Sequence, residues 1–260
     1  MSSGNPIDRR NFLTRGMALA GTAMLGGCDA LSSEPWVRRI LDLAEPLTRV
    51  TQQALLTPQA LAREFSEADI SKNFRANGSI NPRDPQYVAH AENGFADWKL
   101  TLGGLVEQPL ELSLDELRAL PSRTQITRHD CVEGWSCIGK WKGVPLHGLL
   151  ERAGLKADAR YIVFYCADDL GKTGTEAGKY YESIGLDDAF HAQTILAYEM
   201  NDQVLPIPHG APVRLRVERQ LGYKMPKYVM RIEAVDDLAR IRRGRGGYWE
   251  DRGYEWYAGI

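Results

Sequence analysis

The chain has 260 residues, of which 43% are hydrophobic and 25% are charged, which is an ordinary globular composition. Its 32 basic and 34 acidic residues leave a formal net charge of −2, so no excess of positive charge indicates nucleic-acid binding. These values exclude a disordered or fibrous chain, and the length suits one large or two small domains.

The first 28 residues have the pattern of an export signal. Arg9 and Arg10 precede a mildly apolar run over residues 16–27, which is too short to span a bilayer as a mature helix. The arginine pair followed by Asn-Phe-Leu resembles a twin-arginine signal, and a general secretory signal with two chance arginines is the alternative. The twin-arginine route carries proteins that fold before export, often around a cofactor, so the leader favours a cofactor enzyme.

The apolar run ends in Leu-Gly-Gly-Cys, which resembles a lipoprotein cleavage box with Cys28 as the lipidated residue. A lipid chain would tether the protein to a membrane without a spanning helix. Asp29 follows directly, and an aspartate there retains some lipoproteins at the inner membrane. We therefore expect a periplasmic protein anchored to the inner membrane through Cys28. Simple cleavage that leaves an ordinary Cys28 is the alternative.

Residues 29–70 are expected to form a helical, polar entry segment. Apolar residues recur there at near-helical spacing, and Pro46 interrupts the pattern. The main domain is expected over residues 71–240. The remaining residues, 241–260, form an aromatic, loop-like tail, which either presents a docking surface for a partner or folds over the body.

Short strands dominate the main domain. A hairpin is predicted over Trp98–Leu114, and Ser113 with Glu116 three residues later predicts a capping box on a short helix. A strand runs into Cys131, a helix is predicted over Val144–Leu155, and a buried strand over Tyr161–Ala167.

Further short elements follow this buried strand. A short helix is predicted within residues 183–190, a strand within 194–202, and a pair of strands within 211–236. Many strands with few helices predict one strand-rich, mixed α+β domain. No G-x-G-x-x-G, P-loop, H-E-x-x-H or G-x-S-x-G motif is present, so the common dinucleotide, nucleotide, zinc-protease and esterase sites are excluded.

Cysteine chemistry draws attention to Cys131. With Cys28 set aside as the lipid site, three cysteines remain, so an exported protein would keep at least one unpaired thiol. Arg128 and His129 precede Cys131, and positive charge favours the metal-binding thiolate, although Glu133 opposes this effect. A disulfide between Cys131 and Cys137 is the structural alternative. No spacing typical of a zinc site accompanies Cys131.

A second group of polar residues lies on the strand that follows His209. Alternation places Val213 and its apolar neighbours on one face, while Arg214, Arg216 and Glu218 point the other way. A basic Gly/Pro loop follows, with Lys224 and Lys227. This pattern suits an anionic group such as a phosphate. A solvated edge strand followed by a basic loop is the alternative.

Four segments in this order resemble the sulfite oxidase superfamily of molybdopterin enzymes, and they cover roughly residues 70–235. They resemble most its exported bacterial branch, which includes methionine-sulfoxide reductase catalytic subunits. The resemblance implies a sulfite-oxidase-type molybdopterin-binding domain. The segments are DCVEGWS from Asp130, WKGVPLHGLL from Trp141, LPIPHGAPVRLRV from Leu205 and LGYKMPKYV from Leu221.

The resemblance also implies the roles of individual residues. The cysteine of this loop in the family gives its thiolate to molybdenum, so Cys131 is the expected metal ligand and catalytic residue. Cys166 falls where the reductase has a pterin-contacting threonine, a departure that puts a hydroxyl contact in doubt. The expected cofactor-contacting residues are Asn73, Phe74, Arg75, Asn77, Cys166, His209, Arg214, Met225, Pro226 and Lys227.

The function implied by the resemblance is two-electron oxygen-atom transfer with a Mo-molybdopterin cofactor, in the direction of reducing a sulfoxide or a similar oxo-substrate. Glu133 stands where eukaryotic sulfite oxidases have a cationic run, which disfavours a dianion. No haem motif is present, so the expected electron partner is a separate membrane cytochrome b. The alternatives are a sulfite dehydrogenase, a non-catalytic periplasmic binding lipoprotein, and a thiol-redox enzyme that uses Cys131 and Cys137.

Overall fold

The computed structural model describes residues 34–37, 39–40, 47, 50–51, 59–172 and 174–260. The chain divides into two units, Met1–Leu55 and Leu56–Ile260. In the first unit, the described residues from 35 to 51 are helical, as expected for the entry segment. Residues 59–70 belong to the second unit and hold a short 3-10 turn, η1 (Glu67–Asp69), and an isolated bridge from Glu64 to Thr127, so the helical expectation is wrong there. The export signal and Cys28 lie outside the described residues.

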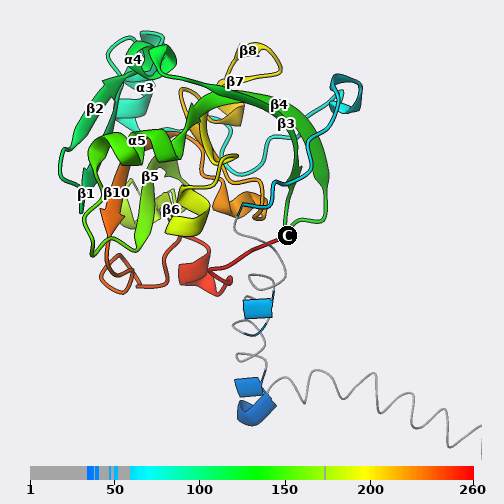
Figure 1. The fold of residues 1–260 in the computed structure, drawn as a ribbon, viewed down its shortest axis with the longest axis vertical. Helices are drawn as coiled ribbons and strands as arrows, with labels where there is room; N and C mark the ends of the chain where they lie inside the picture. The colour runs from blue at the N-terminus through cyan, green and yellow to red at the C-terminus, as the bar shows by residue number, and fades with distance from the viewer. Residues whose placement is uncertain (1–33, 38, 41–46, 48–49, 52–58, 173) are drawn as a thin grey trace, which may run out of the picture. The chain divides into compact units, whose positions relative to one another are not determined.

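The second unit contains two sheets that share one apolar core. Figure 1 shows the first sheet on one side of the domain and a long hairpin of the second sheet on the other. Strand β10 pairs in parallel with β1, and the other pairs of the first sheet are antiparallel. The order of this sheet is β2 (Leu110–Ser113), β1 (Lys99–Gly104), β10 (Val229–Val235), β5 (Tyr161–Asp169) and β6 (Lys179–Gly185).

The second sheet is antiparallel and carries the Cys131 hairpin. Strands β3 and β4 pair from Arg123↔Gly143 to Asp130↔Ser136, and β9 lies against β7. The strands of this sheet are β3 (Arg123–Asp130), β4 (Ser136–Pro145), β7 (Ile195–Met200), β8 (Gln203–Val204) and β9 (Arg214–Arg216).

Short helices and 3-10 turns connect the strands of the two sheets. Helix α4 begins at the predicted capping box, where the Ser113 hydroxyl accepts from the Glu116 backbone N–H and the Glu116 carboxylate accepts from Ser113. The helices are α3 (Pro85–Glu92), α4 (Leu114–Ala119), α5 (Leu146–Ala153) and α6 (Leu186–Ala189), and the remaining 3-10 turns are η2 (Glu176–Gly178), η3 (Ile207–His209), η4 (Gly222–Lys224) and η5 (Glu250–Arg252). Over the described ranges, no helix has the length and apolarity needed to cross a membrane.

The apolar core joins both sheets. Fully buried members include Leu146 of α5, Phe164 of β5, Leu215 of β9 and Ile232 of β10. The two strands expected within residues 211–236 exist, but they belong to different sheets. The segment between β9 and β10 therefore crosses from one sheet to the other, and it carries Lys224, Met225, Pro226 and Lys227.

Candidate functional site

Cys131 lies at the tip of the β3–β4 hairpin in a closed loop. Its backbone N–H donates to the Trp135 carbonyl at 2.9 Å, and the Gly134 N–H donates to the Cys131 carbonyl at 3.0 Å. Gly134 has a φ of +84°, in the left-handed region that glycine adopts without a steric cost. All three cysteines of the described residues, Cys131, Cys137 and Cys166, are free thiols, so the alternative of a Cys131–Cys137 disulfide is wrong.

A buried network of polar side chains stabilises the β3–β4 hairpin. Arg216 binds Glu218 through two nitrogens at 2.9 and 2.6 Å, and Gln125 donates to the same carboxylate at 2.8 Å. Arg216 also donates to Nδ1 of His129 at 2.9 Å, so His129 is neutral and carries its proton on Nε2. Burial is the main reason why the pKa of His129 lies well below its ordinary value, and the positive charge of Arg216 is the second reason. The solvated-edge interpretation of this strand is wrong, because Arg216 and Glu218 are fully buried.

The loop after β9 approaches the hairpin closely at Gly222. A Cβ atom at this position would lie 2.5 Å from the imidazole ring of His129, so a larger residue would push the two segments apart. This close approach brings Met225, Pro226 and Lys227 to the same pocket as Cys131.

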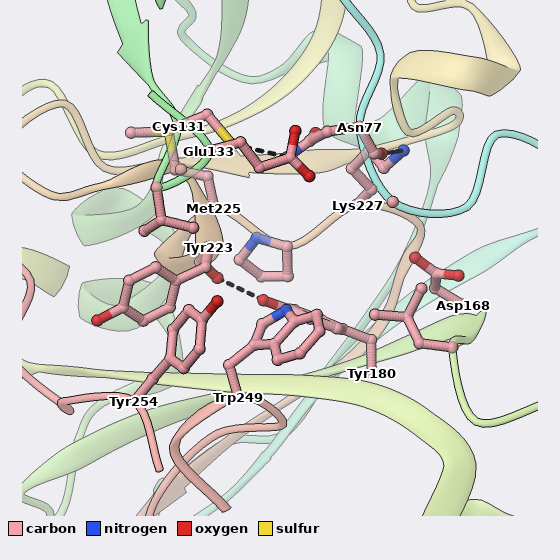
Figure 2. Close-up of a pocket in the computed structure, with 15 residues that line it drawn as sticks. Asn77, Cys131, Glu133, Asp168, Tyr180, Tyr223, Met225, Lys227, Trp249 and Tyr254 are labelled. Atoms are coloured by element: carbon pink, nitrogen blue, oxygen red, sulfur yellow. Dashed lines mark hydrogen bonds between the residues drawn. The ribbon is translucent and has the colours of Figure 1, made fainter. Parts of the chain in front are cut away.

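The pocket opens beside the Cys131 thiol (Figure 2). The Asn77 side-chain amide donates to the Cys131 sulfur at 3.7 Å. In Figure 2, Asn77, Lys227 and Asp168 lie on one side, and Tyr223, Trp249 and Tyr254 lie on another. The lining residues are Asn77, Gly78, Cys131, Val132, Glu133, Asp168, Leu170, Tyr180, Gly222, Tyr223, Met225, Pro226, Lys227, Trp249 and Tyr254.

Two cations near the pocket lack an acidic hydrogen-bond partner among the described residues. Lys227 donates to the carbonyls of Asn77, Ser79 and Pro208 at 2.5–3.0 Å. Arg214 donates to the carbonyls of His209 and Met225, and its buried Nε has no partner.

Burial shifts the pKa values of the ionisable groups near the pocket. Burial lowers the pKa of Lys227 to about 7, with Arg214 adding to the effect and Asp168 opposing it. Burial and Arg216 lower the pKa of Arg214 to about 9, and burial and Arg214 lower that of His209 to about 4. Burial raises the pKa of Asp168, whose Oδ1 atom has no partner. The cationic groups would all be stabilised by a bound anion.

These residues fit an anionic organic group that carries a soft metal. No group of three or more metal-ligating side chains occurs in the part of the chain that the structure describes, so a metal beside Cys131 needs ligands from elsewhere. A thiolate suits a soft redox metal, and the unpaired Nε of Arg214 with the buried Lys227 suits a phosphate. Molybdopterin supplies both a phosphate and sulfur ligands for molybdenum.

Comparison with known proteins decides the family. Residues 87–240 match the family described as "Oxidoreductase molybdopterin binding domain". The chain belongs to this family of the sulfite oxidase superfamily. A protein-methionine-sulfoxide reductase subunit YedZ1, so named, from Azospira oryzae is 38% identical over 251 residues, which cover 96% of this chain and 87% of the relative.

A second relative agrees with this assignment. The protein-methionine-sulfoxide reductase catalytic subunit MsrP of Ralstonia nicotianae is 33% identical, over 84% of this chain and 68% of the relative. Among solved structures, the sulfane dehydrogenase SoxCD of Paracoccus pantotrophus is 26% identical with a TM-score of 0.49, over 55% of this chain and 39% of that chain. The predictions of a molybdopterin oxidoreductase and of a Mo-molybdopterin cofactor are confirmed.

The molybdopterin-binding domain brings most of the expected site residues together. Asn77, Cys131, Met225, Pro226 and Lys227 line one pocket, and Arg214 joins them through the Met225 carbonyl.

Other expected residues surround this pocket at a greater distance. Phe74 packs against the rings of His209 and Trp141, with centroids at 5.7 and 5.3 Å. Arg75 is exposed, and its guanidinium lies 3.9 Å from Glu133. The Asn73 carbonyl accepts from the Cys137 thiol. These residues border the site without lining the pocket.

Cys166 does not join the pocket that contains Cys131. Its side chain is buried in the apolar core, where β5 pairs with β10, so the contact expected at the threonine position stays a prediction. Asp168, two residues later, lines the pocket instead. Sequence reasoning missed Asp168, although two consecutive aspartates at the end of a buried strand were a signal.

Lys227 gives a testable consequence for the cofactor-free protein. Its folded pKa of about 7 lies below its ordinary value of 10.5, so above pH 7 the unfolded chain binds more protons and stability rises with pH. We expect the free energy of unfolding to rise by about 2 kcal/mol more between pH 6.5 and 8.5 in the wild type than in Lys227→Met. Urea unfolding of apoprotein from a host without molybdopterin measures this, and equal slopes would contradict it.

Proposed function

We propose that this chain is an exported reductase that removes oxygen from a sulfoxide: R2S=O + 2e⁻ + 2H⁺ → R2S + H2O. The observation that carries the proposal is the Cys131 thiol, fixed in a closed loop beside buried cations without acidic partners. The direction of the reaction is supported by the relatives, whose names describe protein-methionine-sulfoxide reductase subunits.

Each residue of the site has a distinct role in this proposal. The cofactor supplies two-electron oxygen-atom transfer, with Cys131 as the protein ligand of the metal. Arg214 and Lys227 bind the anionic part of the cofactor and regain the stability that burial costs them. Asn77 orients the Cys131 sulfur through its amide. The network of His129 and Arg216 holds the hairpin in place.

Glu133 favours a neutral substrate over sulfite. Its carboxylate lines the pocket and accepts from the indole N–H of Trp135 at 2.8 Å, which fixes its position. A negative charge beside the reacting centre repels a dianion, and solvent and the Arg75 guanidinium, 3.9 Å from Glu133, weaken this repulsion. A sulfoxide carries no net charge and avoids this repulsion.

The route of electrons and the location are part of the proposal. The leader, with Arg9 and Arg10, supports folding in the cytoplasm followed by export, and Cys28 supports a lipid anchor on the periplasmic face of the inner membrane. The chain carries no haem motif, so a membrane cytochrome b would deliver electrons to the anchored protein.

Metal analysis together with turnover tests this function. Protein made with its own leader and purified from membranes should hold about one molybdenum per chain and reduce methionine sulfoxide with reduced viologen as electron donor. If protein that contains molybdenum oxidises sulfite and reduces no sulfoxide, the chain is a sulfite dehydrogenase instead. Folded, exported protein without molybdenum would leave a binding lipoprotein.

Export has a matched control within the chain. Replacement of both Arg9 and Arg10 by lysine is expected to keep the protein in the cytoplasm, whereas the same change at the second arginine pair, Arg38 and Arg39, should leave export intact. Cys28→Ala should move exported protein from the membrane to the soluble periplasmic fraction. Fractionation and immunoblotting measure both, and unchanged membrane association of Cys28→Ala would exclude the lipid anchor.

A further inference from the structure

The C-terminal segment forms one wall of the pocket. Trp249 and Tyr254 lie beyond residue 240, where the match to the family ends, and both line the pocket that contains Cys131. Their rings stack at 5.2 Å, and Tyr254 meets Tyr223 edge-on at 5.2 Å. We call Tyr223, Trp249 and Tyr254 the aromatic wall (Figure 2). The tail therefore folds over the body, as one of the two alternatives for residues 241–260 expects.

Buried ionic contacts hold this segment against the loop after β9. Lys224 binds Glu250, next to Trp249, at 2.6 Å, and it also binds Glu182 of β6. The Tyr223 hydroxyl donates to the Glu255 carbonyl at 2.6 Å, next to Tyr254. The aromatic wall is thus anchored on both sides of its two C-terminal rings, as a binding surface requires.

The two sides of the pocket differ in chemistry. Asn77, Lys227 and Asp168 are polar and belong to the side that suits the charged cofactor. The aromatic wall offers ring faces, and Tyr254 is 39% exposed, so this side is open to solvent and to an incoming molecule. Aromatic rings favour apolar substituents and contacts with sulfur at about 5 Å. The aromatic wall therefore suits the organic groups of a substrate that carries sulfur.

We propose that Trp249 and Tyr254 select the substrate by binding the apolar substituents on its sulfur atom. This assignment rests on the proposed sulfoxide reduction for the identity of the substrate. It implies that a sulfoxide with a large apolar substituent binds better than a small one, and that the aromatic wall acts on KM more than on kcat.

Kinetics on two sulfoxides of different size test the assignment. Trp249→Leu, Tyr254→Leu and the double variant are compared with Phe190→Leu, an aromatic residue of similar exposure (41%) that does not line the pocket. For methyl phenyl sulfoxide, kcat/KM should fall about 10- to 100-fold in the double variant, mainly through KM. For dimethyl sulfoxide, the fall should stay below about threefold, and molybdenum content should equal that of the wild type.

Several outcomes would overturn the assignment. The assignment is refuted if the double variant contains as much molybdenum as the wild type and keeps wild-type kinetics. It is also refuted if kcat/KM falls equally for both sulfoxides. If Trp249→Leu does not fold, the more exposed Tyr254→Leu carries the test.

Turnover by the wild-type protein distinguishes failure of the proposed function from failure of the assignment to the aromatic wall. Loaded wild-type protein that reduces neither sulfoxide refutes sulfoxide reduction. Calorimetric binding of methyl phenyl sulfone, a neutral probe with the same substituents on sulfur, then still decides the role of the aromatic wall. Equal affinity of wild type and double variant for the sulfone would refute it.

Discussion

Cys131→Ser is expected to abolish turnover while the protein stays folded. A serine hydroxyl at the tip of the β3–β4 hairpin keeps the loop geometry but removes the soft thiolate that we propose as the protein ligand of the metal. We expect kcat to fall by more than about 100-fold, the largest loss that outer partners of a metal site typically cause. Steady-state turnover with reduced viologen measures this, and the metal spectrum should change with it.

Cys137→Ser is the matched control for this experiment. Cys137 is a buried free thiol of the same hairpin, and it contacts the Asn73 carbonyl without lining the pocket. Its replacement should leave kcat within about twofold, because the serine hydroxyl can donate to the same Asn73 carbonyl and no residue that lines the pocket changes. Equal losses in both variants, with activity in metal-free protein, would instead support a thiol-redox enzyme.

Lys224→Met is expected to destabilise the fold more than any surface change. The ammonium group is fully buried between the carboxylates of Glu182 and Glu250, and each of these keeps one oxygen without a partner. Removal of the cation leaves two uncompensated buried carboxyl groups, which costs about 3–5 kcal/mol. Urea unfolding of the holoprotein at neutral pH measures this loss. Lys142→Met, which removes a partly exposed pair with Glu199, should cost less than about 1 kcal/mol.

The pH dependence identifies the cause of this destabilisation. Burial raises the pKa of Glu182 well above its ordinary value, and the charge of Lys224 opposes this rise. Removal of Lys224 raises the pKa of Glu182 further, so the folded variant retains a proton that its unfolded state releases as pH rises. The cost of Lys224→Met should therefore be larger at pH 8 than at pH 5. Combining Lys224→Met with Glu182→Gln and Glu250→Gln should restore most of the stability. A loss independent of pH, without this recovery, would point to simple packing damage.

Much of the fold follows from local patterns. Ser113 and Glu116 fix the start of α4, and Gly154, with a φ of +68°, ends α5 where the periodicity predicts. The run of Val, Phe and Ile residues from Tyr161 predicts β5 as a buried strand. These elements depend on neighbours in sequence, so sequence contains the information. The separation of β9 and β10 into different sheets depends on distant pairing partners and could not be predicted.

The site divides in the same way. Cys131 and Lys227 could be predicted because they lie in short segments that resemble the sulfite oxidase superfamily. The neutral state of His129 depends on Arg216, which lies 87 positions away, and alternation alone could not decide whether Arg216 faces solvent. Likewise, the segment with Trp249 and Tyr254 is held at the pocket by contacts of Lys224 and Tyr223 with residues far along the chain. Contacts of this kind are set by the tertiary structure and leave no periodic signal.

The parallel pairing of β1 with β10 determines when the first sheet can be completed during translation. Thr101 faces Arg231, and β10 lies between β1 and β5, so the middle of the first sheet stays open until residue 235 has left the ribosome. The residues proposed to hold the cofactor, from His209 to Lys227, are also translated late. In the proposed function, molybdopterin would therefore enter a nearly finished chain, whereas Arg9 and Arg10 would emerge from the ribosome first. If these arginines direct export as proposed, recognition of the leader before residue 235 is translated would export a protein without its cofactor.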